Sequence, residues 1–222
     1  MCNYLLKKLQ LSFKKTRLVP GKPPSVEEQK RVIAEIERFS QREDVVLLFF
    51  DPCHLQHNVV NARKWQPKGK KGTIQVKTNT GRKRINILGA LNFSDFSTVV
   101  TLTEEKCNAI RIVEFFQKIK EKYPDKTVVI VIDNAKYNQA WYTRTFAEWY
   151  DIELFFLPPY APNLNLIERL WKFTKKKLVH NRYYEEFETF VNEVEKYFTN
   201  LSEYSADLNT LLSRKFQIIN MV

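Results

Sequence analysis

Two aspartates stand directly after strongly apolar segments of strand length. Asp51 follows residues 45–50, and Asp133 follows residues 128–132. Ligand sites in open α/β sheets lie at the carboxyl ends of strands, so we expect each aspartate to face a crevice. If the two strands are neighbours, their carboxylates need a cation or raised pKa values, and hard oxygen ligands select Mg²⁺ or Mn²⁺. The alternative is that each aspartate only begins a turn or caps a helix.

Glu168 is the third carboxylate of interest, 35 positions after Asp133. Asn165 precedes it at the spacing of a capping box, so the pair alternatively only begins a helix. Lys172 and Lys175 follow Glu168 by four and seven residues, which places all three on nearly the same helix face. Such a basic stripe suits a phosphate backbone beside a metal-bound carboxylate, although lysines also suit the carboxyl end of any helix.

Three carboxylates with two metal ions would serve phosphodiester chemistry without a nucleophilic side chain. One ion lowers the pKa of an attacking water or 3′-hydroxyl, and the other stabilises the leaving oxygen. His54 and His57 follow Asp51 closely, so one of them is a candidate for lining the site. The three histidines lack metal-ligand spacing, and the sequence contains no Gly-rich phosphate-binding loop.

The distribution of charge favours a polyanionic partner. The net charge is +11, and residues 63–84 contain nine Lys or Arg and no Asp or Glu. A basic segment of this density is typical of nucleic-acid binding, and the alternative is a solvated loop. Trp65 is a candidate for stacking on or wedging between bases, or else for core or dimer packing. The candidate DNA contacts are Arg63, Lys64, Trp65, Lys68, Lys70, Lys71, Arg82, Lys83, Arg84, Lys172, Lys175 and Lys176.

The elements that must position these residues follow two patterns. Ser25 is placed to cap a helix that runs to about Phe39. The pattern first predicts an antiparallel meander, with strands at 45–50, around Ile74 and Val76, at 85–93 and at 98–102. An α/β unit is then predicted, with helices at 108–123, 141–150, 166–179 and 184–198 and strands at 127–132 and 152–157. Together they predict one mixed sheet with helices on both faces.

The composition excludes several classes of protein. With 222 residues and 44% hydrophobic side chains, the chain can bury a real core. Its longest apolar run is six residues, far below the roughly 20 that span a bilayer, so we expect no membrane association. Three scattered cysteines form neither a disulfide framework nor a zinc pattern, which indicates a reducing cytosolic compartment.

A long segment of the chain carries a recognisable signature. Residues 157–171 read Leu-Pro-Pro-Tyr-Ala-Pro-Asn-Leu-Asn-Leu-Ile-Glu-Arg-Leu-Trp, which closely resembles the signature of DDE transposases of the mariner superfamily, in particular the bacterial insertion-sequence branch. Residues 131–135 resemble the segment around the second Asp of that family, and residues 49–51 match its first Asp. Residues 84–92 resemble the strand that follows it. The 34 residues between Asp133 and Glu168 match the spacing of the bacterial branch, and the resemblance covers about residues 45–198.

The resemblance implies an RNase H-like fold, a mixed five-stranded sheet flanked by helices. It implies Mg²⁺- or Mn²⁺-dependent DNA cleavage and strand transfer with two ions, and Asp51, Asp133 and Glu168 as the metal-binding triad. Double-stranded DNA, namely terminal inverted repeats and target DNA, is the implied partner, and a homodimer the implied assembly. We expect a bacterial or archaeal cytosolic protein associated with the nucleoid. Further candidates for lining the site are Asn134, Asn138 and Asn165.

The chain departs from its relatives at several positions. Pro52 stands where many relatives have Glu, Asn138 where many have His, and Ala161 where Ser is usual. We expect residues 1–24 to be a remnant of a helix-turn-helix DNA-binding region with a linker, and residues 25–44 a connecting helix. Residues 45–200 are the expected catalytic domain, and residues 201–222 an expected helical tail.

Two alternative functions remain at this stage. The short front of the chain suggests either the second reading frame of a split transposase gene or a truncated copy. A truncated copy would be an inactive remnant that binds DNA and dimerises. The other alternative is a housekeeping RNase H-like nuclease for RNA–DNA hybrids or DNA junctions, against which the signature at residues 157–171 argues.

Overall fold

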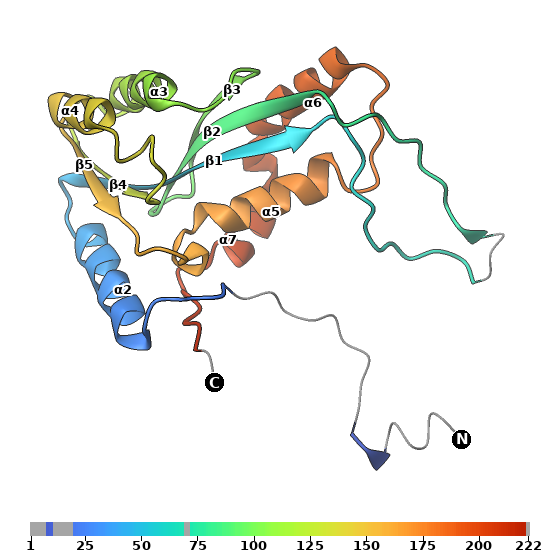
Figure 1. The fold of residues 1–222 in the computed structure, drawn as a ribbon, viewed down its shortest axis with the longest axis horizontal. Helices are drawn as coiled ribbons and strands as arrows, with labels where there is room; N and C mark the ends of the chain where they lie inside the picture. The colour runs from blue at the N-terminus through green and yellow to red at the C-terminus, as the bar shows by residue number, and fades with distance from the viewer. Residues whose placement is uncertain (1–7, 11–19, 69–71, 221–222) are drawn as a thin grey trace.

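A five-stranded mixed sheet lies at the centre of the computed structural model, which describes residues 8–10, 20–68 and 72–220 (Figure 1). The strand order is β3-β2-β1-β4-β5. The strands are β1 (Val45–Gln56), β2 (Arg84–Asn92), β3 (Thr98–Thr103), β4 (Thr127–Ile132) and β5 (Ile152–Phe156). Strands β1 to β3 form an antiparallel meander, and β4 and β5 run parallel to β1. The predicted mixed sheet is therefore confirmed.

Strand β1 is longer than its apolar pattern indicates. It continues past Phe50 to Gln56, because its ladder with β2 runs from Leu48↔Asn92 to Gln56↔Arg84. Asp51 therefore lies inside the strand, and the prediction that it stands at the strand's end was wrong. Backbone pairing with β2 holds this part of β1 in the sheet without needing apolar side chains on both faces.

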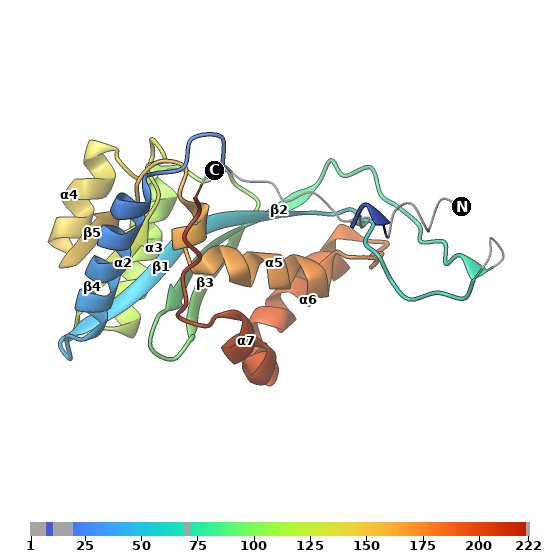
Figure 2. The ribbon, with the colours of Figure 1, turned by 90° about the horizontal axis from the view of Figure 1, so that it is seen from below.

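The expected strand around Ile74 and Val76 is absent. Residues 73–83 form no strand, and Ile74 is 53% exposed. These residues belong to a long excursion, residues 57–83, that we call the arm. It leaves the end of β1, projects away from the sheet and returns to the start of β2 (Figures 1 and 2). Alternating hydrophobicity misled the prediction because no neighbouring strand lies there to pair with.

Helices cover both faces of the sheet. On one face pack α3 (Ala109–Lys122) and α4 (Trp141–Trp149), and this cluster is called the α3-side core. The other face carries α2 (Val26–Ser40), α5 (Ile167–Leu178), α6 (Phe187–Thr199) and α7 (Ser205–Leu211), and this cluster is the α5-side core. Figure 2 shows α5, α6 and α7 below the long strands β1 and β2. Alternation divides β1 accordingly: Phe50 joins the α3-side core, whereas Phe49 and Cys53 join the α5-side core.

The predicted cap at Ser25 is confirmed, and the structure shows a second side-chain cap at Asn108. Ser25 caps α2 and accepts a hydrogen bond from the Glu28 amide, and Asn108 caps α3 through the Arg111 amide. All four residues of the predicted inner face of α3 are buried, namely Ile112, Phe115, Phe116 and Ile119. None of the helices in the described ranges is long and apolar enough to cross a membrane.

The C-terminal segment is only partly the expected helical tail. A 3-10 turn (Leu201–Tyr204) and α7 are followed by residues 213–219, which are not helical and are called the strap. Leu208, Leu212 and Ile219 are buried, the first two of them in the α5-side core. The expected helix-turn-helix remnant at 1–24 lies mostly outside the described residues.

Candidate active site

Asp51 and Asp133 are brought together by parallel pairing of β1 with β4. The last pair in that ladder is Phe49↔Val131, and each aspartate lies two residues further along its strand. Phe49 and Val131 both face the α5-side core, and the same alternation directs both aspartates to that face. The expectation that the two strands are neighbours is confirmed.

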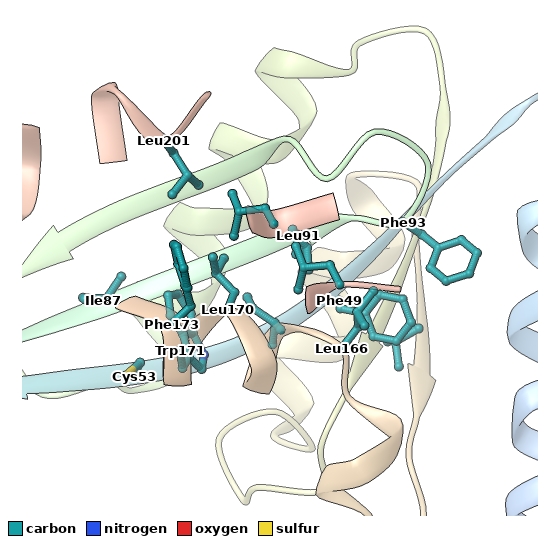
Figure 3. Packing of buried hydrophobic residues seen from close by; sticks show 14 of the residues in the cluster. Phe49, Cys53, Ile87, Leu91, Phe93, Leu166, Leu170, Trp171, Phe173 and Leu201 are labelled. Carbon is teal, nitrogen blue, oxygen red and sulfur yellow. The ribbon is translucent and has the colours of Figure 1, made fainter. Parts of the chain in front are cut away.

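Helix α5 lies directly against Asp51. The indole Nε1 of Trp171 donates a hydrogen bond to Asp51 Oδ2 at 3.1 Å. Gly89 pairs with Asp51 across β1 and β2, and the Trp171 ring covers its Cα so closely that a Cβ would lie 2.4 Å from Cη2. Figure 3 shows Trp171 between α5 and the strands, near Cys53 and Ile87. A glycine is therefore required beside Asp51 for the indole to reach it.

The electrostatic environment joins the three carboxylates. Burial, followed by the charges of Glu168 and then Asp133, raises the pKa of Asp51 to about 8. The hydrogen bond from Trp171 and the charge of Lys175 act in the opposite direction without cancelling the rise. Asp51 is thus a carboxyl group that its neighbours hold protonated at neutral pH when no cation is present.

Other titratable groups on the opposite side of the sheet belong to the same environment. Burial raises the pKa of Cys107 to about 11, with further contributions from Asp51 and Asp133. Burial, Cys107 and then the two aspartates also raise the pKa of Tyr137. Both side chains remain neutral near the carboxylates. Neither residue was singled out from the sequence, because their positions follow only from the sheet topology.

Asp133 is held by the loop that follows β4. Its Oδ1 accepts hydrogen bonds from Asn138 Nδ2 at 2.6 Å and from the Ala135 amide at 3.0 Å. Asn138 is fully buried, and its own Oδ1 is buried without a partner among the described residues. No hydrogen bond within the described ranges reaches Asp133 Oδ2, which leaves that oxygen available to a ligand. Asn138 therefore lies in direct contact with Asp133.

Asn165 joins the start of α5 to β1 rather than capping the helix. The predicted capping box is wrong, because Leu166 occupies the cap position and no side chain bonds the first turn. Asn165 Nδ2 instead donates to the Phe50 carbonyl at 3.1 Å, directly before Asp51. This buried bond fixes where α5 begins relative to β1, and hence where Glu168 stands relative to Asp51.

The donor set fits a hard divalent cation. Asp51 and Asp133 lie on the same face of neighbouring strands, Glu168 lies on the helix that covers that face, and burial with the charges of Glu168 and Asp133 raises the pKa of Asp51. Within the described ranges, no three His, Cys, Asp or Glu side chains are grouped closely enough to hold one ion together.

The other predicted site residues lie elsewhere. His54 is exposed, on the face of β1 opposite to Asp51, and burial, Arg84 and Lys175 lower its pKa. His57 was predicted to line the site but lies six residues beyond Asp51, about 20 Å along an extended strand. It packs against α6, stacked on Phe190, and its ring bonds the Tyr184 carbonyl.

Asn134 has a structural role in the same loop. Its Nδ2 donates to the Leu157 carbonyl, and its Oδ1 accepts from Gln139 Nε2 at 2.6 Å. These bonds tie the loop after β4 to the end of β5. Asn134 therefore supports the segment that carries Asp133 without bonding the carboxylate itself.

Comparison with known proteins identifies the family. A family model described as "DDE superfamily endonuclease" matches residues 46–191. The chain belongs to the DDE superfamily endonucleases. No curated protein sequence matches this endonuclease at a significant level.

Solved structures share the fold of the endonuclease. The "Mos1 transposase paired-end complex with left transposon end" aligns with a TM-score of 0.68 at 16% identity, covering 97% of this chain and 71% of that chain. The "Mos1 mariner paired end complex with Mn" gives 0.70 at 17%, covering 96% and 67%. The isolated catalytic domain of Mos1 mariner transposase gives 0.58 at 15%, covering 89% and 94%. These matches confirm the RNase H-like fold, while the bacterial insertion-sequence branch stays a prediction.

The predicted DNA contacts of this DDE endonuclease fall into two groups. In the arm, Trp65 is 100% exposed, which excludes the alternative that it packs in the chain's own core. The exposed basic residues at the arm and its base are Arg63, Lys64, Lys68, Arg82, Lys83 and Arg84, whereas Lys70 and Lys71 lie outside the described residues. On α5, Lys172 and Lys176 line a groove with Glu168, while the charge of Lys175 acts on Asp51.

Sequence reasoning did not find the Trp171–Asp51 contact. Trp171 was assigned only to the inner apolar stripe of its helix, and that stripe is indeed buried. The available signal was Gly89, a glycine inside an apolar strand, which indicates the close approach of another group.

Proposed function

We propose that this chain is the catalytic domain of a mariner-type transposase, which cleaves DNA at transposon ends and joins the 3′ end to target DNA. The observation that carries the proposal is the convergence of Asp51 and Asp133 on one face of neighbouring strands, with Glu168 on helix α5, whose Trp171 bonds Asp51. The similar Mos1 structures include a "Strand Transfer Complex" and paired-end complexes with Mg and Mn.

Each residue of the site has a role that its contacts support. Asp51, Asp133 and Glu168 would hold two Mg²⁺ or Mn²⁺ ions, which when bound supply an activated oxygen nucleophile and stabilise the leaving oxygen. Trp171 orients one carboxylate oxygen of Asp51. Asn138 and the Ala135 amide fix the other aspartate and direct its free oxygen towards the site.

The arm supplies a surface for a second molecule. Trp65 is wholly exposed and is flanked by Arg63, Lys64 and Lys68, which have no ion-pair partner among the described residues. Exposed aromatic and basic side chains in one segment suit contact with nucleic acid through stacking and phosphate pairing. We infer that the arm binds DNA, and that two copies of the chain act together on two transposon ends.

The decisive experiment is a cleavage assay on duplexes that carry the inverted repeats flanking the gene. With Mn²⁺ or Mg²⁺, we expect cleavage by the unaltered protein and by Asp125→Asn, which removes an exposed aspartate far from the site. Asp133→Asn should abolish cleavage while leaving DNA binding intact. Equal cleavage by Asp133→Asn would reject the triad.

The same assay separates the alternatives. An inactive remnant would bind the duplex with strong salt dependence but would not cut it with either metal. A housekeeping nuclease would prefer an RNA–DNA hybrid of the same sequence over the inverted-repeat duplex. Preference for the inverted-repeat duplex, with strand transfer to a second DNA, supports the transposase.

A further inference from the structure

A basic groove of about 990 Å³ runs from Glu168 along α5. One wall is the exposed side of α5, where Glu168, Lys172 and Lys176 follow one another at intervals of four residues and so share one face. The opposite wall is the strap, with Lys215 and Phe216. Figure 2 shows the C-terminal segment, in dark red, leaving α7 and passing the start of α5.

The strap is held in place by a set of specific hydrogen bonds. Arg169, adjacent to Glu168, donates to the carbonyls of Ser213 and Lys215, both at 2.7 Å. The fully buried Gln29 donates to the Ile219 carbonyl at 2.8 Å and accepts from the Ile219 amide at 2.9 Å. Because the buried Gln29 bonds one end of the strap and Arg169 bonds two carbonyls nearer α7, the strap forms a fixed wall and not a loose end.

The cations that line this groove are not neutralised. Lys172, Lys176 and Lys215 are exposed and form no ion pair with any described residue. Only Lys177 is paired, with Asp207 at 3.5 Å. Three like charges on facing walls repel one another, so the arrangement favours an anion with several charged groups spaced along its length.

We propose that the groove binds a single DNA strand that continues from the active site, with phosphates paired to Lys172, Lys176 and Lys215. The proposal rests on the proposed function, since the strand must begin at the carboxylates. The groove has the volume of a site for one drug-sized ligand, which corresponds to about two nucleotides of a single strand. Phe216, half-buried and stacked on Phe93, offers an aromatic surface on the strap side.

The test compares duplex probes with and without a single-stranded extension of about six thymidines, on either the 3′ or the 5′ strand. Binding is measured by fluorescence anisotropy in the Asp133→Asn background, so that cleavage does not interfere. Three phosphate contacts on a single strand should steepen the slope of log K against log salt by about two. We therefore expect an extension of one polarity to raise affinity about tenfold at low salt, with that steeper slope.

A variant without the three lysines of the groove tests whether they cause the effect of the single-stranded extension. In Lys172→Ala/Lys176→Ala/Lys215→Ala, the extension should add nothing to affinity or slope relative to the blunt duplex measured with the same variant. The matched control is Lys196→Ala, an exposed lysine on α6 outside the groove, which should keep the full effect of the extension.

Two outcomes overturn the proposal: an affinity that does not depend on the extension in the parent protein, or an extension effect that survives in the triple variant. Failure of the proposed function gives a different result, namely that the unaltered protein does not cleave the DNA. An extension effect that depends on the three lysines would then still assign the groove to single-stranded DNA.

Discussion

Gly89 and Trp171 are in such close contact that no side chain fits between them. A Cβ at Gly89 would lie 2.4 Å from Cη2 and 2.7 Å from Cζ2 of the indole. The same indole donates its N–H to Asp51, the strand partner of Gly89. The position of the Asp51 carboxylate therefore depends on the absence of a side chain at Gly89 on the neighbouring strand.

Gly89→Ala should impair both stability and activity. The added methyl group forces the indole away from β2, which costs about 1–3 kcal/mol in the free energy of unfolding and breaks the bond to Asp51. Urea denaturation and the cleavage rate measure the two effects. Gly21→Ala is the control, since nothing lies within 4 Å of a Cβ at Gly21. Equal behaviour of the two variants would contradict the role of the close contact.

Without metal, the stability of the protein should fall as pH rises from about 4 to 8. The pKa of Asp51 is raised from 3.8 to about 8 in the folded state, so the folded protein keeps a proton that the unfolded chain loses in this range. The stabilisation is complete below the pKa that Asp51 has in the unfolded chain. It is lost as the pH rises through the pKa of Asp51 in the folded protein. Asp51→Asn should remove this dependence and unfold at higher urea than the parent at pH 8.

At pH 8, divalent metal should reverse the order of stability of the parent protein and Asp51→Asn. Mn²⁺ binds the ionised carboxylate, so it should stabilise the parent protein but not Asp51→Asn. Asp125→Asn serves as the control, because that aspartate is exposed and distant from the site. A parent stability that rises with pH in the absence of metal would refute the protonated state of Asp51.

Asn138→Ala should weaken the use of metal more than it disturbs the fold. Asp133 then keeps only the Ala135 amide, and loss of a bond that orients a metal ligand typically costs about 10- to 100-fold in affinity or activity. The measurement is the cleavage rate against Mn²⁺ concentration. Asn134→Ala is the matched control, since its bonds reach Leu157 and Gln139 instead of the carboxylate. Indistinguishable metal dependence in the two variants would remove Asn138 from this role.

The base of the arm should loosen in Asn181→Gly. Asn181 accepts from the Ala62 amide at 3.0 Å and donates to the Ala62 carbonyl at 2.9 Å, which ties the arm to the connection between α5 and α6. Glycine retains the positive φ of 54° at this position but loses both bonds, together worth about 2 kcal/mol. Amide exchange at Ala62 should accelerate by at least about tenfold, while exchange in β2 stays unchanged. Unchanged exchange at Ala62 would show that other contacts hold the arm.

Neutralising the arm should change the salt dependence of DNA binding. Replacing Arg63, Lys64 and Lys68 with alanine removes three phosphate contacts, which lowers the slope of log K against log salt by nearly three. The control removes three exposed charges from α2 and α6, at Lys30, Arg31 and Lys196, and should leave the slope as it was. A slope that both triple variants share would mean that the arm does not contact the duplex.

Most of the fold was accessible from the sequence because its elements are locally specified. The cap at Ser25 and the inner faces of α3 and α5 were predicted correctly. Two strand predictions failed at places where pairing overrides pattern. Strand β1 continues through Asp51 because β2 pairs with it. Ile74 and Val76 form no strand because no described strand pairs with them.

The site was only partly accessible for a related reason. The three carboxylates carry their own signals in strand position and motif, so they could be named in advance. Their supports depend on contacts between residues far apart in the chain, such as Asn165 with Phe50 and Trp171 with Asp51. His57 lies near Asp51 in the sequence but is separated from it by the length of an extended strand, which is why proximity in sequence misled the prediction.

The pairing of Gln29 with Ile219 has a consequence for biosynthesis. The two residues are 190 positions apart, so Gln29 is made long before its partner leaves the ribosome. A nascent chain can form α2 and most of the sheet while Gln29 still lacks its partner and the groove beside Glu168 has only one wall. Docking of the strap therefore completes the second wall of the groove, and a nascent chain without residues 213–219 lacks one side of the proposed strand-binding site.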